Sequence, residues 1–264
     1  MSPSPSSPKT CERSSARSAP VLDYPLALLL FATGAQTPLL ALLSLRRPRN
    51  LLVVVFPYVA LGVLLVPLAG FTGLAVLVLG PSPLIGGRLA PFVGARQDRV
   101  GALGVATLVV AFVLLLGAMP SYGGVLQRAI LAFVAGVVLA GVVPTVRDLL
   151  LPVLEAARYV AMAVILVMLV IVGVPTLDWT AVGIAVGVLV VGALAAAVLA
   201  VVMHADPLSA TLGAGTRDPV VAGALLMATG ANEAVGIPLA YAGLLAVTLL
   251  TLGLGRKLLV RADA

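Results

Sequence analysis

The chain has 264 residues, of which 61% are hydrophobic and only 10% are charged, and its mean hydropathy is +1.20. A soluble domain cannot bury so much apolar surface, so the composition excludes a water-soluble globular protein and indicates one that lies in lipid. The apolar stretches are continuous and rich in Leu, Val and Ala, without the alternation of a transmembrane β-barrel. The sequence therefore predicts an all-α polytopic membrane protein.

Charge and cysteine content narrow the chemistry further. The net charge of +6 is better explained by membrane topology than by a nucleic-acid partner, and we expect no such partner. Cys11 is the single cysteine, which excludes an intramolecular disulfide. One histidine and one tryptophan leave little for metal or haem ligation, so we expect no metal and no cofactor. The signatures HExxH and GxSxG are missing from the sequence, and we do not expect an enzyme.

The chain begins with a polar, Ser- and Pro-rich stretch, residues 1–20, that predicts a disordered tail. Breaks at charged clusters, Pro and Gly then give nine apolar segments, each about long enough to cross a bilayer as a helix. They are 22–45, 50–69, 71–94, 98–119, 127–150, 155–174, 179–203, 207–231 and 235–255. The linkers are short, so we expect one transmembrane domain over residues 21–256, followed by a cytoplasmic tail at 257–264.

Basic residues are concentrated in alternate loops. The loops after the first, third, fifth and seventh segments, with the C-terminus, hold Arg46, Arg47, Arg49, Arg96, Arg99, Arg147, Arg158, Arg256, Lys257 and Arg261. The other loops hold Arg128 alone. The positive-inside rule then predicts an external N-terminus and a cytoplasmic C-terminus. We expect a plasma-membrane location, with a plastid or another inner membrane as the alternative.

Two of the nine segments are interrupted, the third by "GPSPLIGGR" (80–88) and the eighth by "GAGTRDP" (213–219). In each interruption a capping side chain precedes a proline, as Ser82-Pro83 and as Asp218-Pro219, which is the pattern that starts a helix. Each segment is therefore predicted to end one half-helix and to begin another inside the membrane. The backbone groups freed there must face protein or a water-filled cavity.

The two interruptions occupy matching places, in the third of four and the fourth of five helices. Paired discontinuous helices are the best sequence pointer to the substrate site of a secondary transporter. Nine segments fit two five-helix repeats if the first repeat lacks its opening helix. The repeats would then be residues 21–120 and 126–256, with inverted topology.

The sequence resembles the bile acid:sodium symporter superfamily over about residues 24–255. The similarity lies in "LSLRRPRNLLV" (43–53), "LVLGPSPLIGGRLAPFVGARQD" (77–98) and "TLGAGTRDPVVAGALLMATGANEAVGIPLAYAGLL" (211–245). The resemblance implies a panel domain and a core domain, with the two broken helices crossing at mid-membrane and the substrate bound near the crossing. Some members lack the first of ten helices, which would account for nine here.

The residues that bind sodium in the best-known members of this superfamily are replaced in this chain. The early Ser-Asn pair of the family falls on Gly86 and Gly87, the late Glu on Gly213, the Gln on Arg217 and the following Asn on Asp218. Hard cations need converging oxygen ligands, which these substitutions remove. The sequence therefore argues against sodium coupling at the usual sites.

Arginine inside a membrane is functional by default and binds carboxylates with a two-pronged fork. The leading hypothesis is a secondary active transporter of a small organic anion that works by alternating access. The candidate substrate-binding residues are Arg217, Asp218, Thr216, Arg88, Gly86, Gly87, Ser82, Gly213 and Gly215. Asp218 and Glu233 are the candidates for proton coupling.

For these residues the sequence also allows purely structural roles. Arg217 and Asp218 can pair with each other, Arg88 can reach toward the cytoplasmic face, the four glycines can serve close packing, and Glu233 can lie in an external loop. The rival functions are a sodium- or proton-coupled carrier or efflux permease for another solute and, in another class, a channel or a non-transporting membrane component. We expect the protein to be surrounded by lipid, and the sequence leaves open whether it forms a homodimer.

Overall fold

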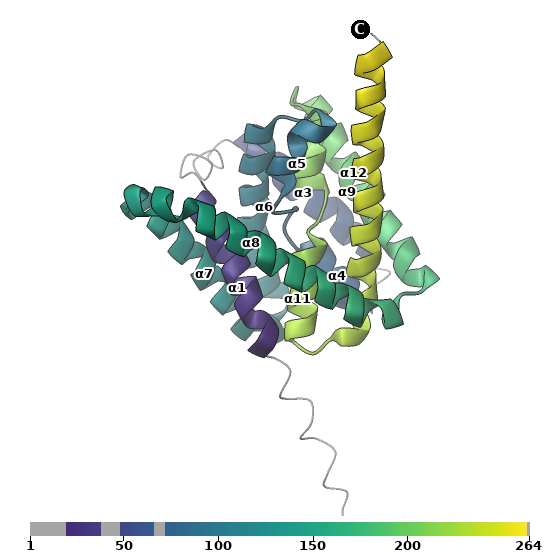
Figure 1. The fold of residues 1–264 in the computed structure, drawn as a ribbon. Helices are drawn as coiled ribbons and strands as arrows, with labels where there is room; N and C mark the ends of the chain where they lie inside the picture. Colours follow the sequence, from purple (N-terminus) through teal and green to yellow (C-terminus); the bar gives the residue numbers. More distant parts are fainter. Residues whose placement is uncertain (1–19, 38–47, 66–71, 263–264) are drawn as a thin grey trace, which may run out of the picture.

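In the computed structural model, residues 20–37, 48–65 and 72–262 are described, and within these ranges all regular structure is helical (Figure 1). Five helical stretches in this part of the chain are long and apolar enough to span a membrane. They are Gln97–Ala118, Pro120–Val142, Pro144–Thr176, Trp179–Val202 and Asn232–Leu258. A span needs about 20 apolar residues, so the prediction of an all-helical chain with helices able to cross a membrane is confirmed for the described residues.

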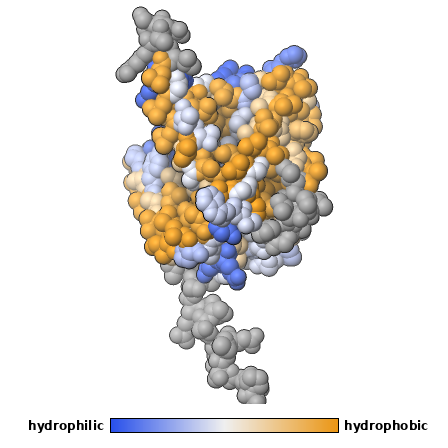
Figure 2. Space-filling view, turned by 90° about the vertical axis from the view of Figure 1, so that its right-hand side faces the viewer, coloured by the Kyte–Doolittle hydropathy of each residue, from blue (hydrophilic) through white to orange (hydrophobic). Residues whose placement is uncertain are grey.

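The surface agrees with a lipid environment. Figure 2 shows apolar residues over most of the face that it displays, with hydrophilic residues mainly toward its upper and lower ends. Large apolar side chains such as Leu149, Val160 and Ile171 are exposed along one long helix. Water would oppose so large an apolar surface, whereas lipid tails do not.

Three helices pack into one group. They are α1 (Pro20–Gln36), α7 (Gly123–Val142) and α8 (Pro144–Gly173), and α1 contacts the other two along its length. Gly34 of α1 faces Phe133 and Gly136 of α7 faces Phe31, and a Cβ atom at either glycine would overlap the facing backbone. These two glycines therefore allow the backbones of α1 and α7 to touch.

The second group surrounds the two interrupted segments. Its continuous helices are α3 (Pro48–Leu65), α6 (Gln97–Ala118), α9 (Trp179–Val202) and α12 (Gly236–Ala262). The first interrupted segment consists of α4 (Thr72–Leu79) and α5 (Gly86–Val93), and the second of α10 (Pro207–Ala210), a π-helical turn (Thr211–Gly215) and α11 (Pro219–Ala228). All residues of α11 are buried, as expected for a helix that is apolar on every side.

The boundary between the fifth and sixth predicted segments is wrong. The sequence placed a cytoplasmic loop between residues 150 and 155, but α7 ends at Val142 and α8 begins at Pro144. Proline is well tolerated at a first helical position because its missing N–H has no partner there. Arg158, counted above as a loop residue, therefore lies within α8 and is buried.

The predicted tails at the two ends of the chain can be compared with the structure to different extents. The predicted tail at residues 1–20 lies, except for Pro20, outside the described residues, as do Arg46 and Arg47. At the other end, α12 continues through Ala262, so the described part of the predicted tail, residues 257–262, prolongs the helix. In Figure 1 this end of α12 extends beyond the neighbouring helices.

Candidate functional site

The second interruption begins with a π-helical turn and ends at Asp218. After the π turn, Thr216 has extended backbone angles, and α11 starts at Pro219. The carboxylate of Asp218 accepts hydrogen bonds from the backbone N–H groups of Val220 (2.8 Å) and Val221 (3.1 Å). The prediction that Asp218 caps the second half-helix is confirmed.

The first interruption runs from Gly80 to Ile85, and its predicted cap is wrong. α5 begins at Gly86, and no side chain caps it. The Ser82 side chain instead pairs with the Thr107 hydroxyl of α6 at 2.8 Å, and the Ser82 N–H donates to the same oxygen at 3.1 Å. A tight turn in which Gly86 N–H donates to Pro83 O separates Ser82 from the helix start.

The two interruptions are hydrogen-bonded to each other. Asp218 N–H donates to Pro81 O at 2.7 Å, and Leu84 N–H donates to the second carboxylate oxygen of Asp218 at 2.8 Å. Backbone groups left without a helical partner in one segment are thus satisfied by the other segment. This contact brings together residues that lie more than 130 positions apart, and it meets the requirement that freed backbone groups face protein.

Arg217 lies at the centre of this junction and is fully buried. Its Nε donates to Val78 O at 2.9 Å, and Nη1 donates to Ala214 O at 2.7 Å and Thr216 O at 3.1 Å. The guanidinium lies 4.1 Å from the ring centroid of Tyr58, close enough for a cation–π interaction. Among the described residues no ion pair joins Arg217 to Asp218, so the contacts of Arg217 are with backbone carbonyls and an aromatic face.

The four candidate glycines divide into two kinds. A Cβ atom at Gly213 would lie 2.7 Å from Leu103 Cβ, and one at Gly215 would lie 2.6 Å from Gly192 O, so both positions serve close packing. A Cβ at Gly86 would come 3.3 Å from a Val100 methyl group, and one at Gly87 would have its nearest neighbour at 3.7 Å. Gly87 also lines a cavity.

A cavity of about 300 Å³ lies beside the junction, between α1 and α8 on one side and the first interruption, α5 and α6 on the other. Its polar lining residues are Thr33, Gln36, Thr37, Arg88, Gln97, Asp98 and Arg158. Leu84, whose N–H binds Asp218, also lines it. The cavity thus joins the candidate Arg88 and Gly87 to a second arginine that the sequence analysis did not select.

The two arginines of this cavity have different partners. Arg88, whose side chain is about half exposed (52%), forms an ion pair with Glu155 of α8. Arg158 is only 4% exposed, and its Nη1 donates to Gln36 Oε1 of α1. Sequence reasoning missed Arg158 because charged residues were taken as loop markers; the stretch "LEAARYV" contains no Gly or Pro and is consistent with continuous helix.

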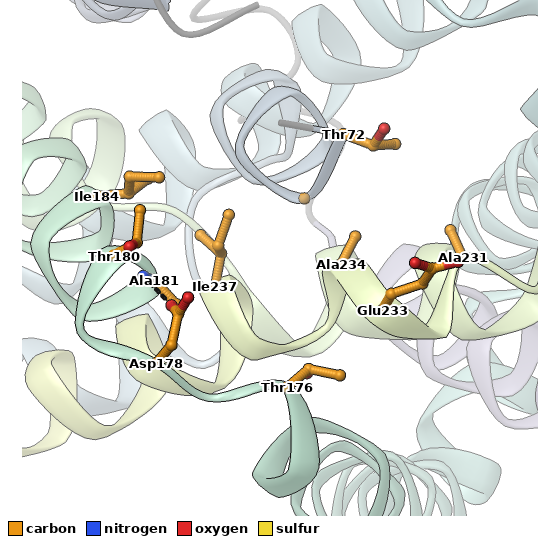
Figure 3. Close-up of a pocket in the computed structure, with 11 residues that line it drawn as sticks. Thr72, Thr176, Asp178, Thr180, Ala181, Ile184, Ala231, Glu233, Ala234 and Ile237 are labelled. Carbon is orange, nitrogen blue, oxygen red and sulfur yellow. Dashed lines mark hydrogen bonds between the residues drawn. The ribbon is translucent and has the colours of Figure 1, made fainter. Parts of the chain in front are cut away.

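Glu233 does not join this arrangement. It lies in a short 3₁₀ turn (Asn232–Ala234), is exposed, and lines a separate cavity of about 450 Å³ with Asp178 and several threonines (Figure 3). Asp178 caps α9 by accepting a hydrogen bond from Ala181 N–H at 2.6 Å, drawn as a dashed line in Figure 3. The proton-coupling candidates Asp218 and Glu233 therefore lie in different parts of the molecule.

Comparison with known protein families finds no match for this chain, and comparison with curated proteins finds none either.

Proposed function

We propose that this chain is a secondary active transporter that carries a small organic anion by alternating access, at a site beside the junction of two discontinuous helices. The observation that supports the proposal most is the direct hydrogen bonding of the two interruptions next to a cavity lined by two arginines. In secondary transporters, discontinuous helices meet in this way where substrate binds. Arginine and the N-terminal ends of half-helices attract anions.

The proposed architecture follows the resemblance to the bile acid:sodium symporter superfamily. In the proposed architecture, nine membrane spans form two inverted repeats. Helices α1, α7 and α8 form the panel domain, and the remaining helices form the core domain. The cavity lies where these groups meet, so that a shift of one group against the other would open it to alternate sides. Arg217 and Asp218 hold the crossing together, while Arg88, Gly87 and the residues around them face substrate.

The proposed orientation rests on charge. A cavity of about 460 Å³ lined by Arg49, Arg99 and His204 is assigned to the cytoplasmic side, and the cavity with Asp178 and Glu233 to the outside. The residues that bind sodium in the superfamily that the chain resembles are replaced here. The proposed transport is therefore coupled to a proton, or it exchanges one anion for another.

A counterflow experiment tests the function. Purified protein in liposomes preloaded with unlabelled pyruvate, acetate or succinate should take up the same labelled anion with saturable kinetics, without a sodium gradient. Protein-free liposomes are the control, and a pH gradient tests for coupling to protons. Non-saturable flux would indicate a channel, and no flux of any of the three anions would contradict the proposal.

A further inference from the structure

Three hydrogen-bond donors beside the cavity are buried and have no hydrogen-bond partner in the described part of the chain. They are Nε and Nη2 of Arg158 and Nε2 of Gln36. Both residues line the cavity, and they come from different helices, α8 and α1. Buried donors without acceptors are costly, and charged ones more so, and they are therefore rare unless a function requires them.

The geometry of these donors suits a carboxylate. The Nη1 group of Arg158 donates to Gln36 Oε1, which fixes both side chains relative to each other. The unpaired Nε and Nη2 share one edge of the planar guanidinium, where two parallel N–H bonds can receive both oxygens of a carboxylate. Because its oxygen faces the arginine, the Gln36 amide presents its NH₂ group as a third donor.

The charges around the cavity favour an anion with one negative charge. Glu155 compensates Arg88, and Asp98 is paired with Arg96. No described carboxylate pairs with Arg158, whose guanidinium otherwise lies 5.4 Å from the Tyr159 ring centroid. Within the described ranges Arg217 also has no ion pair and its Nη2 has no partner, but its other N–H groups donate to backbone carbonyls of the junction, and it does not line this cavity. Of the two arginines that line the cavity, Arg158 is therefore the one whose charge is left for a ligand. The cavity volume of about 300 Å³ limits that ligand to a small molecule.

We propose that Arg158 anchors the carboxylate of a small monocarboxylate through its Nε–Nη2 edge, with the Gln36 amide as an additional donor. This inference rests on the proposed function, because the donors are enclosed in the present arrangement. They become accessible when α1 and α8 move relative to α5 and α6, as alternating access requires.

Binding to the purified full chain in detergent tests the assignment. Pyruvate should raise the melting temperature of the wild type, and the rise should vanish in Arg158→Met. Arg158→Lys keeps the charge but loses the two-pronged fork, and its affinity for pyruvate should fall about tenfold or more. Arg147→Met, which removes a charge from an exposed pair with Asp148 on the same helix, should bind pyruvate like the wild type.

The stability of the unliganded variant separates binding from a structural role. Arg158→Met removes a buried charge that has no ion pair in the described part of the chain, but it also leaves Gln36 Oε1 without its donor. The two effects oppose each other, so without ligand the variant should melt within a few degrees of the wild type or above it. A decrease of about 10 °C or more, well beyond the loss of one hydrogen bond, would mean that Arg158 supports the fold, and this would overturn the proposal. Binding of pyruvate by Arg158→Met, absence of a pyruvate effect on the wild type, or a preference for phosphate over pyruvate would overturn it too.

A counterflow assay distinguishes failure of the Arg158 assignment from failure of the proposed transport function. Pyruvate exchange that persists in Arg158→Met would reject the anchor and keep the transporter. Pyruvate binding that depends on Arg158, in a protein without counterflow of any anion, would keep the binding site and reject transport.

Discussion

Asp218 combines a helix cap with a link between the two interruptions, and its removal should be among the most destabilising single substitutions in the chain. The carboxylate accepts hydrogen bonds from Leu84, Val220 and Val221, and the residue is 4% exposed. Asp218→Ala leaves three N–H groups without a partner, of which those of Val220 and Val221 are buried and that of Leu84 is partly buried. Each buried group costs about 1–3 kcal/mol, and the partly buried one is at the lower end of this range. We expect a loss of about 3–7 kcal/mol in the free energy of unfolding.

Asp218→Asn separates the two roles. Asparagine is as good an N-cap as aspartate, so its amide oxygen can still accept from Val220 and Val221. Its NH₂ group, however, would face the N–H of Leu84, and two donors cannot bond to each other. The loss should be about 1–3 kcal/mol, smaller than that of the alanine variant.

The assay is unfolding of the purified protein by an SDS titration in mixed micelles, followed by circular dichroism. Asp178→Ala is the matched control, because Asp178 is an exposed N-cap that binds one backbone N–H group and should lose only about 1 kcal/mol. If Asp218→Ala lost no more than this control, or if Asp218→Asn were as destabilised as Asp218→Ala, the division into a cap and a link would be wrong.

Two further predictions use the same titration. Gly215→Ala should cost about 1–3 kcal/mol by overpacking against Gly192. Gly87→Ala, whose Cβ would meet only ordinary van der Waals contacts at 3.7 Å and beyond, should be neutral or gain up to about 1 kcal/mol; equal effects would contradict the packing argument. Tyr58→Phe should lose about 1–2 kcal/mol, because the Tyr58 hydroxyl donates to Gly80 O at 2.9 Å and lies 3.1 Å from Thr107 O; an unchanged stability would show that neither contact matters.

Features governed by local chemistry could be predicted from the sequence. Continuous apolar runs predicted helices, and both interruptions lie where Gly, Pro and polar residues cluster. Asp218 caps α11 as predicted, since an N-cap binds N–H groups two and three residues away. No long-range information is needed for such contacts.

Features governed by distant partners could not be predicted. Ser82-Pro83 has the same local pattern as Asp218-Pro219, yet Ser82 binds Thr107, which belongs to another helix. The hydroxyl therefore has an alternative partner that the local sequence does not reveal. Likewise, Arg158 can remain inside α8 because Gln36, 122 positions away, accepts one of its N–H groups.

The contrast between Arg217 and Arg158 bears on which parts of the molecule would move during transport. Arg217 joins Val78 in the first interrupted segment to Ala214 and Thr216 in the second. Breaking these contacts would leave a charge and several carbonyls unpaired in a buried site, so the junction should move as one rigid unit. The cavity is crossed by the ion pair of Arg88 with Glu155, whereas Arg158 and Gln36 both lie on its α1–α8 side. The Arg88–Glu155 pair joins α5 to α8, and since both of its side chains are partly exposed, its rupture costs less. In the proposed transport cycle, the two groups of helices would therefore separate at the cavity rather than at the junction.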